Sequence, residues 1–419
     1  MTLPVYCEEQ LVGEVHADAA GPRFVYAASW VADHHAFPLS VTMPLADREV
    51  EPARFVTWAS NLLPEAEQLT MIARQLGVAP GDVLTLLAAI GRDTAGALSF
   101  GAPGLTDSAQ WQRIPGADAL ERIIEELPRK PFLAGEDGVS MSLAGVQTKL
   151  AVACDADGQL YIPLDGSPST HILKPDSDRL PGSVQNEAWC LTLARRCGLD
   201  VPVVTTGVAG GRQFFLIPRY DRIADGAAWR RLHQEDFCQA LGLPPSAKYE
   251  RNGTGVRGPA VADMMHLVRR RALGPDALRL FDAVVFNVLA CNTDAHAKNY
   301  SILIPPGGRV AMAPLYDVMC AEVFVGVTPN LAQTIADKNR GQHLKRRHWL
   351  RLAAACGLGG TPTLRRIRAL ATRVLAQVEP ARRAVEAMPA GGSPTLPLMV
   401  EAVAARCRAI LSGLEEEAA

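Results

Sequence analysis

Residues 281–317 read FDAVVFNVLACNTDAHAKNYSILIPPGGRVAMAPLYD, and this stretch decides how the rest of the chain is interpreted. It opens with apolar residues spaced as on one buried helix face, then breaks into a polar run that ends at Asn299. A short apolar segment, a Pro-Pro-Gly-Gly turn at 305–308 and a second strand ending at Asp317 follow, which is typical of a β-hairpin. We therefore expect Asp294, Asn299 and Asp317 at the ends of elements held by apolar neighbours.

The spacing of these three side chains suits phosphoryl transfer. That reaction needs a base near the attacking hydroxyl and oxygen ligands that hold Mg²⁺ against the phosphates. Asp294 and Asn299 have the D-x-x-x-x-N spacing found in protein kinases, and Asp317 follows the hairpin. We interpret Asp294 as the base and Asn299 and Asp317 as metal ligands. Lys298, between them, is a candidate for neutralising the transferred phosphoryl charge.

The same spacing also arises by chance, and an alternative interpretation stays open. On that alternative, Asp294 ends a helix and Asn299 forms hydrogen bonds within a loop. Two departures from conventional protein kinases are also present. Asn292-Thr293 precede Asp294 in place of His-Arg, and Tyr316-Asp317-Val318 stand in place of Asp-Phe-Gly.

The composition indicates a folded protein of two or three domains. The chain has 419 residues, of which 48% are hydrophobic and 21% charged. A net charge of -2 gives no sign of a surface that coats nucleic acid. The nine cysteines lack C-x-x-C spacing, so we expect reduced thiols in the core. Neither a signal peptide nor a membrane span is apparent, which predicts a soluble, cytoplasmic protein.

The order of elements predicts an α+β protein in three parts. We expect an N-terminal α+β subdomain over 1–135, a nucleotide-binding lobe over 136–245, and a mostly helical lobe with the catalytic loop over 246–419. The basic run at 338–348 is interpreted as a solvated loop, with a polyanion-binding loop as the alternative.

A lysine and a glutamate in the second part resemble a phosphate-gripping pair. Lys174 follows the apolar strand residues 171–173, and Glu187 lies on the packing face of a helix over 184–197. Because a buried carboxylate needs a partner, Glu187 is a candidate to pair with Lys174, as in kinases. The alternative is that Glu187 only complements the dipole near the start of its helix.

The chain order adds weight to these separate signals. The run 142–149 precedes a strand as a phosphate loop would, although it has one glycine and no P-loop motif. Residues 214–221 form an apolar strand that turns polar, as expected of the hinge between two kinase lobes. Loop, lysine, glutamate, hinge, Asp/Asn pair and final aspartate therefore occur in the order of a two-lobed kinase.

Several motifs resemble the HipA family, the serine/threonine kinase toxins of HipA–HipB toxin–antitoxin modules. They include NLLPE, IGRDTAGAL, SLAGVQTKL, THILKPD, RYDR, RLHQEDFCQALGLPPSAKYE, NTDAHAKNYSIL and PLYDVM, and they run in order from residue 4 to near 350. The resemblance implies a two-lobed, protein-kinase-like fold with an extra N-terminal subdomain and an all-helical C-terminal lobe. It also implies ATP and Mg²⁺ as cosubstrate and cofactor.

The resemblance assigns roles to residues. Asp294 is implied as the catalytic base, Asn299 and Asp317 as metal ligands, and Ser142 as an autophosphorylated serine. A phosphate on Ser142 would bring about two negative charges into the ATP loop and switch the enzyme off. The implied nucleotide-binding residues are Ala144, Gly145, Val146, Gln147, Thr148, Lys149, Lys174, Pro218, Arg219, Tyr220, Asp221, His296, Lys298, Asn299, Tyr316 and Asp317, with Glu187 as the ion-pair partner of Lys174.

The resemblance also implies partners. These are a protein substrate, expected to be an aminoacyl-tRNA synthetase, and a HipB-like helix-turn-helix antitoxin that binds operator DNA. One departure is Pro218, where family members can have an acidic residue. Proline offers no N–H, so an adenine contact through that amide is impossible. Two alternative functions remain: a catalytically silent antitoxin partner and corepressor, or a small-molecule kinase.

Overall fold

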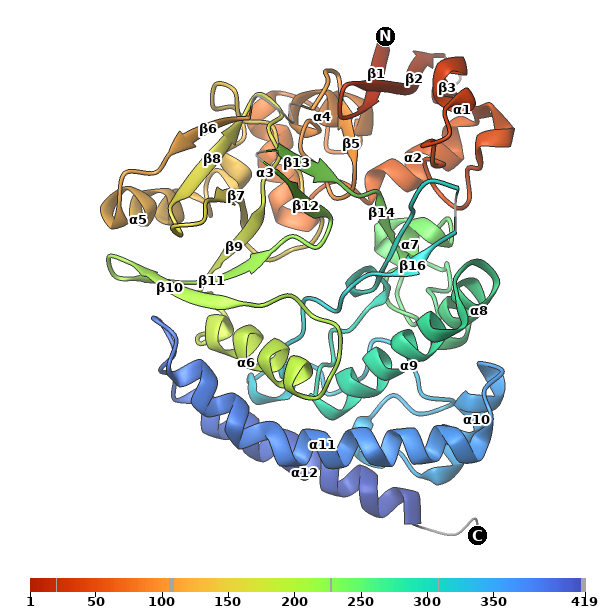
Figure 1. Cartoon of the computed structure of the whole chain (residues 1–419), viewed down its shortest axis with the longest axis vertical. Helices are drawn as coiled ribbons and strands as arrows, with labels where there is room; N and C mark the ends of the chain where they lie inside the picture. The colour runs from red at the N-terminus through yellow and green to blue at the C-terminus, as the bar shows by residue number, and fades with distance from the viewer. Residues whose placement is uncertain (20, 105–108, 227, 308, 416–419) are drawn as a thin grey trace.

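The structure, a computed structural model, describes residues 1–19, 21–104, 109–226, 228–307 and 309–415. Figure 1 shows the N-terminal strands at one end of the molecule and helices α11 and α12 lying side by side at the other. Within these ranges, no helix combines the length and apolar character needed to cross a bilayer. All nine cysteines fall inside the described ranges and are free thiols, and seven of them are buried, as the sequence predicts.

The N-terminal subdomain is built on an antiparallel five-stranded sheet of order β4-β3-β2-β1-β5. Val12, Val15 and Phe24 of its strands are fully buried, as expected of a sheet with one covered face. Phe24 stacks on Phe55 of helix α2, with ring centroids 6.1 Å apart. The elements are β1 (Thr2–Cys7), β2 (Gln10–Asp18), β3 (Gly21–Tyr26), α1 (Ala28–Ala32), β4 (Glu49–Val50), α2 (Pro52–Ser60), α3 (Ala66–Leu76), α4 (Val83–Ile90) and β5 (Leu98–Phe100).

The second part is an antiparallel six-stranded sheet of order β10-β11-β9-β7-β8-β6. Its edge strand β6 begins at Gln110, so this sheet takes in residues that the predicted boundary at 135 leaves in the first part. Helix α6 is buried between the sheet and α11, and the Trp189 indole donates to the Val378 carbonyl of α11 at 3.3 Å. The elements are β6 (Gln110–Arg113), α5 (Ala117–Glu126), β7 (Leu150–Cys154), β8 (Leu160–Leu164), β9 (His171–Pro175), α6 (Ser183–Arg196), β10 (Thr205–Ala209) and β11 (Arg212–Pro218).

The third part is mostly helical, and it begins with the strands and the short helix over 222–240, which the predicted boundary at 245 leaves in the second part. A small sheet of order β14-β15-β16 contains the predicted hairpin and carries the loops on either side of it. The second strand of that hairpin is shorter than expected and ends at Met312. The elements are β12 (Arg222–Asp225), β13 (Ala228–Arg231), β14 (Gln234–Asp236), α7 (Phe237–Ala240), α8 (Val261–Arg271), α9 (Gly274–Leu289), β15 (Ser301–Leu303), β16 (Ala311–Met312), α10 (Arg346–Ala355), α11 (Gly360–Glu386) and α12 (Thr395–Glu415).

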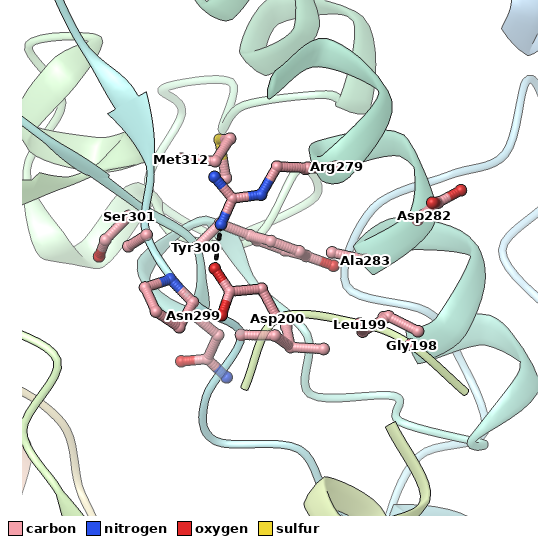
Figure 2. Close-up of a pocket in the computed structure, with 13 residues that line it drawn as sticks. Gly198, Leu199, Asp200, Arg279, Asp282, Ala283, Asn299, Tyr300, Ser301 and Met312 are labelled. Atoms are coloured by element: carbon pink, nitrogen blue, oxygen red, sulfur yellow. Dashed lines mark hydrogen bonds and ion pairs between the residues drawn. The ribbon is translucent and has the colours of Figure 1, made fainter. Parts of the chain in front are cut away.

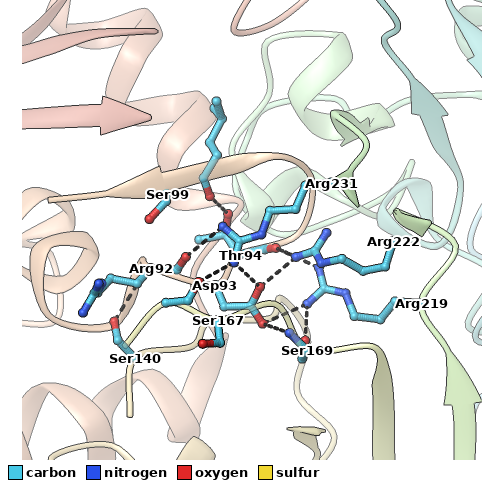
Figure 3. A network of polar contacts seen from close by, with 12 residues as sticks. Arg92, Asp93, Thr94, Ser99, Ser140, Ser167, Ser169, Arg219, Arg222 and Arg231 are labelled. Carbon is cyan, nitrogen blue, oxygen red and sulfur yellow. Dashed lines mark hydrogen bonds and ion pairs between the residues drawn. The ribbon is translucent and has the colours of Figure 1, made fainter. Parts of the chain in front are cut away.

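A buried charge cluster joins the N-terminal subdomain to the other two parts. Figure 3 shows three arginines converging on Asp93, which is 1% exposed. The Asp93 carboxylate lies 2.8 Å from Arg222 and 3.5 Å from both Arg219 and Arg231. Burial alone would raise the pKa of Asp93, but the three guanidinium groups outweigh burial and lower it. Asp221 supplies a second carboxylate, 2.7 Å from Arg219.

We predict that Asp93→Ala destabilises the whole chain, because it leaves Arg219 and Arg222 to share Asp221 and takes from Arg231 its carboxylate partner. The unfolding free energy should fall by about 3–5 kcal/mol. A matched control is Glu379→Ala, which removes a half-exposed carboxylate from its pair with Arg382 on α11. The control should lose less than about 1 kcal/mol. Urea denaturation of both variants measures the difference, and equal losses would contradict this account.

Candidate active site

The candidate catalytic loop begins where helix α9 ends. The chain turns at Cys291, whose φ of 58° lies in the left-handed region. The Asn292 side chain then fixes the turn by donating to Asn287 and accepting the backbone amide of Asp294 at 3.1 Å. Asn299 donates its side-chain nitrogen to the Asp294 carbonyl at 3.0 Å. The D-x-x-x-x-N spacing therefore forms a closed loop, in which the amide oxygen of Asn299 is the atom left to face a cation.

The Asp294 carboxylate is exposed to the cleft and held from one side. The Tyr249 hydroxyl donates to its Oδ1 at 2.5 Å. The pKa of Asp294 is raised, mainly because the cleft walls displace much of the surrounding water and also because Asp317 adds a like charge. The hydrogen bond from Tyr249 acts in the opposite direction but is outweighed. A carboxylate with a raised pKa that is open to the cleft is suited to accept a proton from an incoming hydroxyl.

Lys174 links three elements at the centre of the site. Its ammonium lies 2.7 and 2.9 Å from the two carboxylate oxygens of Glu187 on α6, and 2.6 Å from Oδ1 of Asp317. Burial lowers the pKa of Lys174, but the carboxylates of Asp317 and Glu187 outweigh burial and raise it, so the ammonium stays charged. Asp317 itself has a φ of 55°, a strained conformation for a residue other than glycine. The predicted Lys174–Glu187 pair is therefore present.

The loop Ala144–Lys149 lies beside this cluster. Gly145 has a φ of 108°, which favours glycine, and the Lys149 ammonium donates to the Ala144 carbonyl at 2.5 Å. Burial and the nearby charge of Lys174 lower the pKa of Lys149 to about 8. The loop therefore presents an amine whose charge is lost just above neutral pH.

Ser142 lies two residues before the start of this loop and is fully buried. Its hydroxyl donates to the Leu62 carbonyl at 2.8 Å, and its amide donates to the Asp93 carbonyl at 3.0 Å. A phosphate has no room in this position. Ser142 must leave its site under the N-terminal subdomain before it can accept a phosphoryl group.

The predicted hinge follows strand β11. Pro218 pairs with His171, and the next residue, Arg219, donates its amide to the Thr170 carbonyl at 2.8 Å. Because hydrogen-bonded and non-hydrogen-bonded pairs alternate in an antiparallel ladder, the Pro218 carbonyl points away from β9 and the missing N–H costs the sheet nothing. The side chains of Arg219 and Asp221 are engaged in the buried Asp93 cluster, where Arg219 pairs with both carboxylates.

Aromatic rings form the wall next to the hinge. Tyr220 stacks on Tyr316 with ring centroids 5.4 Å apart, and the Tyr316 hydroxyl is hydrogen-bonded to Ser301 at 2.7 Å. His296 packs edge-on against Tyr249, and its buried Nδ1 has no hydrogen-bond partner among the described residues. Burial lowers the pKa of His296 to about 3, so the ring is neutral at pH 7.

Lys298 does not have the role that its place in the sequence suggests, which is to neutralise the transferred phosphoryl charge. Its buried ammonium lies 2.5 Å from Asp236 and donates to both the carbonyl and the side-chain oxygen of Asn61, at 3.1 and 3.0 Å. These three acceptors occupy the three N–H donors of the Lys298 ammonium, so none is left for a phosphoryl group. Lys298 therefore ties the catalytic loop to the N-terminal subdomain.

One cleft of about 1440 Å³ contains the predicted site. The structure brings all of the predicted base, metal, nucleotide and ion-pair residues to its lining: Ala144, Gly145, Val146, Gln147, Thr148, Lys149, Lys174, Glu187, Pro218, Arg219, Tyr220, Asp221, Asp294, His296, Lys298, Asn299, Tyr316 and Asp317. The sequence predictions missed Tyr249, Lys248 and Glu65, which also line it. Tyr249 and Lys248 lie in the RLHQEDFCQALGLPPSAKYE motif, but nothing in the spacing of that motif shows that they reach Asp294 and Glu65.

The residues at the base of the cleft fit a magnesium ion better than a metal held by protein alone. The described residues include no group of three or more His, Cys, Asp or Glu that could hold a metal. An amide oxygen from Asn299 and a carboxylate from Asp317 match the small protein share of a Mg²⁺ site that phosphate oxygens complete. These two residues would hold the ion.

A smaller cavity of about 280 Å³ lies behind the catalytic loop. Figure 2 shows Arg279 of α9 reaching Asp200 beside Asn299 and Ser301. Because Asn299 lines both cavities, the rear of the catalytic loop is not packed solidly against α9.

Comparisons with known proteins agree with this geometry. The HipA-like C-terminal domain matches residues 141–382, and the HipA N-terminal domain matches residues 3–101. This chain belongs to the HipA family. Among relatives of this HipA-family chain, a Sinorhizobium fredii protein named "Putative kinase Y4mE" is 38% identical over 376 residues, covering 87% of each chain. Serine/threonine-protein kinase toxin HipA of Shewanella oneidensis is 32% identical over 352 residues, covering 81% of this chain and 79% of the relative.

A solved structure extends the match to nearly the whole HipA-family chain. A complex of Shewanella oneidensis HipA, HipB and its operator DNA contains a chain that superposes with a TM-score of 0.84. That chain is 26% identical, and the match covers 98% of this chain and 97% of the other. The predicted α+β, two-lobed, kinase-like fold is confirmed.

The lowered pKa of Lys149 predicts a pH dependence for binding of a phosphate-bearing ligand. Below about pH 8 the ammonium is charged and attracts phosphates; above that pH it loses the charge. The affinity for Mg²⁺-ATP should be flat from about pH 7 to about pH 8 and then fall by up to about tenfold per pH unit. Calorimetric titration with a non-hydrolysable ATP analogue tests this, and Lys149→Met should remove the fall. The same slope in both proteins would contradict it.

Proposed function

We propose that this HipA-family chain is an ATP-dependent serine/threonine protein kinase. One observation carries the proposal: the Lys174 ammonium is held by Glu187 of one lobe and Asp317 of the other, at 2.7 and 2.6 Å, within the cleft that Asp294 faces. Two lobes joined at a charged lysine form the arrangement that grips the phosphates of ATP in kinases. The kinase named among the relatives supports the same class.

Each residue has a defined task in this mechanism. Asp294 accepts the proton of the acceptor hydroxyl. The hydroxyl oxygen forms a bond to the γ-phosphorus, while the bond between the γ-phosphorus and the bridging oxygen breaks and ADP leaves. Lys174 and Lys149 hold the phosphates by charge. Asn299 and Asp317 would hold Mg²⁺, which would supply neutralisation of the phosphate charges. Tyr249 orients the Asp294 carboxylate through its 2.5 Å hydrogen bond.

The proposed substrate is a component of translation, and an aminoacyl-tRNA synthetase is the specific candidate. The proposed partner is a HipB-like helix-turn-helix antitoxin, through which the chain meets operator DNA. The solved Shewanella oneidensis complex, which contains HipA, HipB and operator DNA, supports this partnership. The absence of a membrane-crossing helix from the described residues is consistent with the proposed site of action in the cytoplasm.

Replacing the proposed base tests the enzyme against a catalytically silent partner. Asp294→Asn keeps the shape of the side chain but cannot accept a proton. Transfer of label from [γ-³²P]ATP to protein in a cell extract should fall by about 10²–10⁴-fold. Label on metabolites instead of protein would indicate a small-molecule kinase. Equal label with both proteins would remove the kinase proposal.

Ser142 supplies a second test. We expect mass spectrometry of protein aged with Mg²⁺-ATP to find phosphate on Ser142, and activity to fall as this phosphate accumulates. The physical reason is that a phosphate carrying about two negative charges cannot return beside Leu62, so the loop that receives ATP phosphates is displaced. Ser142→Ala should keep its activity under the same conditions. If wild-type activity declines without phosphate on Ser142, self-inhibition has another cause.

A further inference from the structure

A short segment of the N-terminal subdomain contacts both the phosphate loop and the catalytic loop. This 61–68 segment connects helix α2 to the first turn of α3 and runs from Asn61 to Gln68. Asn61 and Gln68 are buried, and both line the active-site cleft. The segment therefore belongs to the wall of the site, although it is far from the kinase motifs in sequence.

On one side, the 61–68 segment holds the phosphate loop. The Glu65 amide donates to the Gly145 carbonyl at 3.2 Å, and the Gln68 side chain donates to the Val146 carbonyl at 2.7 Å. Pro64 and Gly145 also form a parallel bridge. The loop itself is neither helix nor strand, and its Val146 side chain is 51% exposed. These hydrogen bonds to the N-terminal subdomain thus fix a backbone that has little packing of its own.

On the other side, the segment holds the catalytic loop through two lysines. Lys298 donates to the carbonyl and side chain of Asn61. Lys248 lies 2.6 Å from Glu65, and the Lys248 carbonyl accepts the amide of Ala297 in the catalytic loop at 3.0 Å. The next residue after Lys248 is Tyr249, which holds Asp294.

The Asn61 side chain is itself fixed on both ends. Its nitrogen donates to the carbonyls of Thr57 and Leu243, at 2.9 and 3.0 Å, while its oxygen accepts from Lys298 at 3.0 Å. An amide that is satisfied in this way has one orientation, so it sets where Lys298 can lie. Because Lys298 adjoins Asn299 in the chain, this fixes the catalytic loop at the residue next to a proposed metal ligand.

We propose that the 61–68 segment positions the two halves of the active site, with Gln68 setting the phosphate loop and Asn61 setting the catalytic loop. The inference rests on the kinase function proposed above. Asn61 opens the NLLPE motif, to which the resemblance assigns no role, and Gln68 lies outside the quoted motifs. Gln68 and Asn61 are positioning residues, since they act on ATP and on the acceptor through other residues. The two residues should therefore affect different kinetic constants.

Gln68→Leu tests the phosphate-loop contact, and the chain offers a matched control on the same helix. Gln75 of α3 also donates its amide nitrogen to a backbone carbonyl, that of Ala134 at 2.5 Å, but it does not line the cleft. We expect Gln68→Leu to raise the KM for ATP by about fivefold or more with kcat changed less than about twofold, as loss of one hydrogen bond predicts. Gln75→Leu should lower the melting temperature similarly and leave KM unchanged. Equal KM values for the two variants would overturn the assignment.

Asn61→Ala tests the catalytic-loop contact. We expect kcat to fall by about tenfold or more with little change in the KM for ATP, because the loop that carries Asp294 and Asn299 loses its anchor while the phosphate loop keeps Gln68. Asn61→Asp retains the acceptor for Lys298 but loses the donor to the Thr57 and Leu243 carbonyls, so kcat should recover in part while the melting temperature stays low. If kcat and KM change only in proportion to the loss of melting temperature, Asn61 has a structural role alone.

Hydrogen–deuterium exchange separates failure of this inference from failure of the kinase proposal. Without nucleotide, amides of residues 144–149 should exchange faster in Gln68→Leu than in wild type or Gln75→Leu. This readout does not need activity. If the wild-type protein is inactive, the proposed function is wrong, but the exchange result still tests the contact between Gln68 and the phosphate loop. Unchanged exchange in Gln68→Leu, with active wild-type protein, would overturn the positioning role alone.

Discussion

The ammonium of Lys174 is the charge on which the site depends. It is buried, and a buried cation is tolerated only with close, well-aligned anions. Glu187 on α6 and Asp317 after the hairpin provide them, so each lobe contributes one carboxylate to the same cation. Separating the lobes would take Asp317 away from the ammonium and leave Glu187 as its one carboxylate partner. The electrostatic requirement of one side chain thus holds the cleft together and also sets where negative phosphates can enter.

A similar balance operates at the rear of the hinge. Three arginines and two carboxylates are buried where residues 93, 219–222 and 231 meet. Such clusters add little net stability compared with apolar packing, but they are costly to misassemble. The N-terminal subdomain supplies Asp93, and the hinge supplies Arg219, Arg222 and Asp221. The orientation of the hinge is therefore specified by a contact that only the correct docking of the subdomain completes.

The sequence predicted much of the fold, because its strongest signals are local. The C-terminal half of helix α9 and the hairpin after the catalytic loop follow from apolar spacing and turn residues. Order along the chain also predicted that Lys174, Glu187, Asp294, Asn299 and Asp317 converge. The partners of Lys298 and Arg219 could not be predicted, because Asn61 and Asp93 lie over 100 residues away in sequence. Such contacts come from docking of subdomains, which leaves no periodic pattern.

In the proposed kinase, Pro218 would determine what kind of ring edge the hinge can recognise. The ladder turns its carbonyl away from β9, and the ring nitrogen carries no hydrogen. At that position the backbone is an acceptor without a neighbouring donor. A purine with an exocyclic amino group can satisfy the oxygen, whereas one with a keto group there would oppose it with another lone pair. Discrimination between the two purines at this point would then come from repulsion of the wrong base and not from a paired set of hydrogen bonds to the right one.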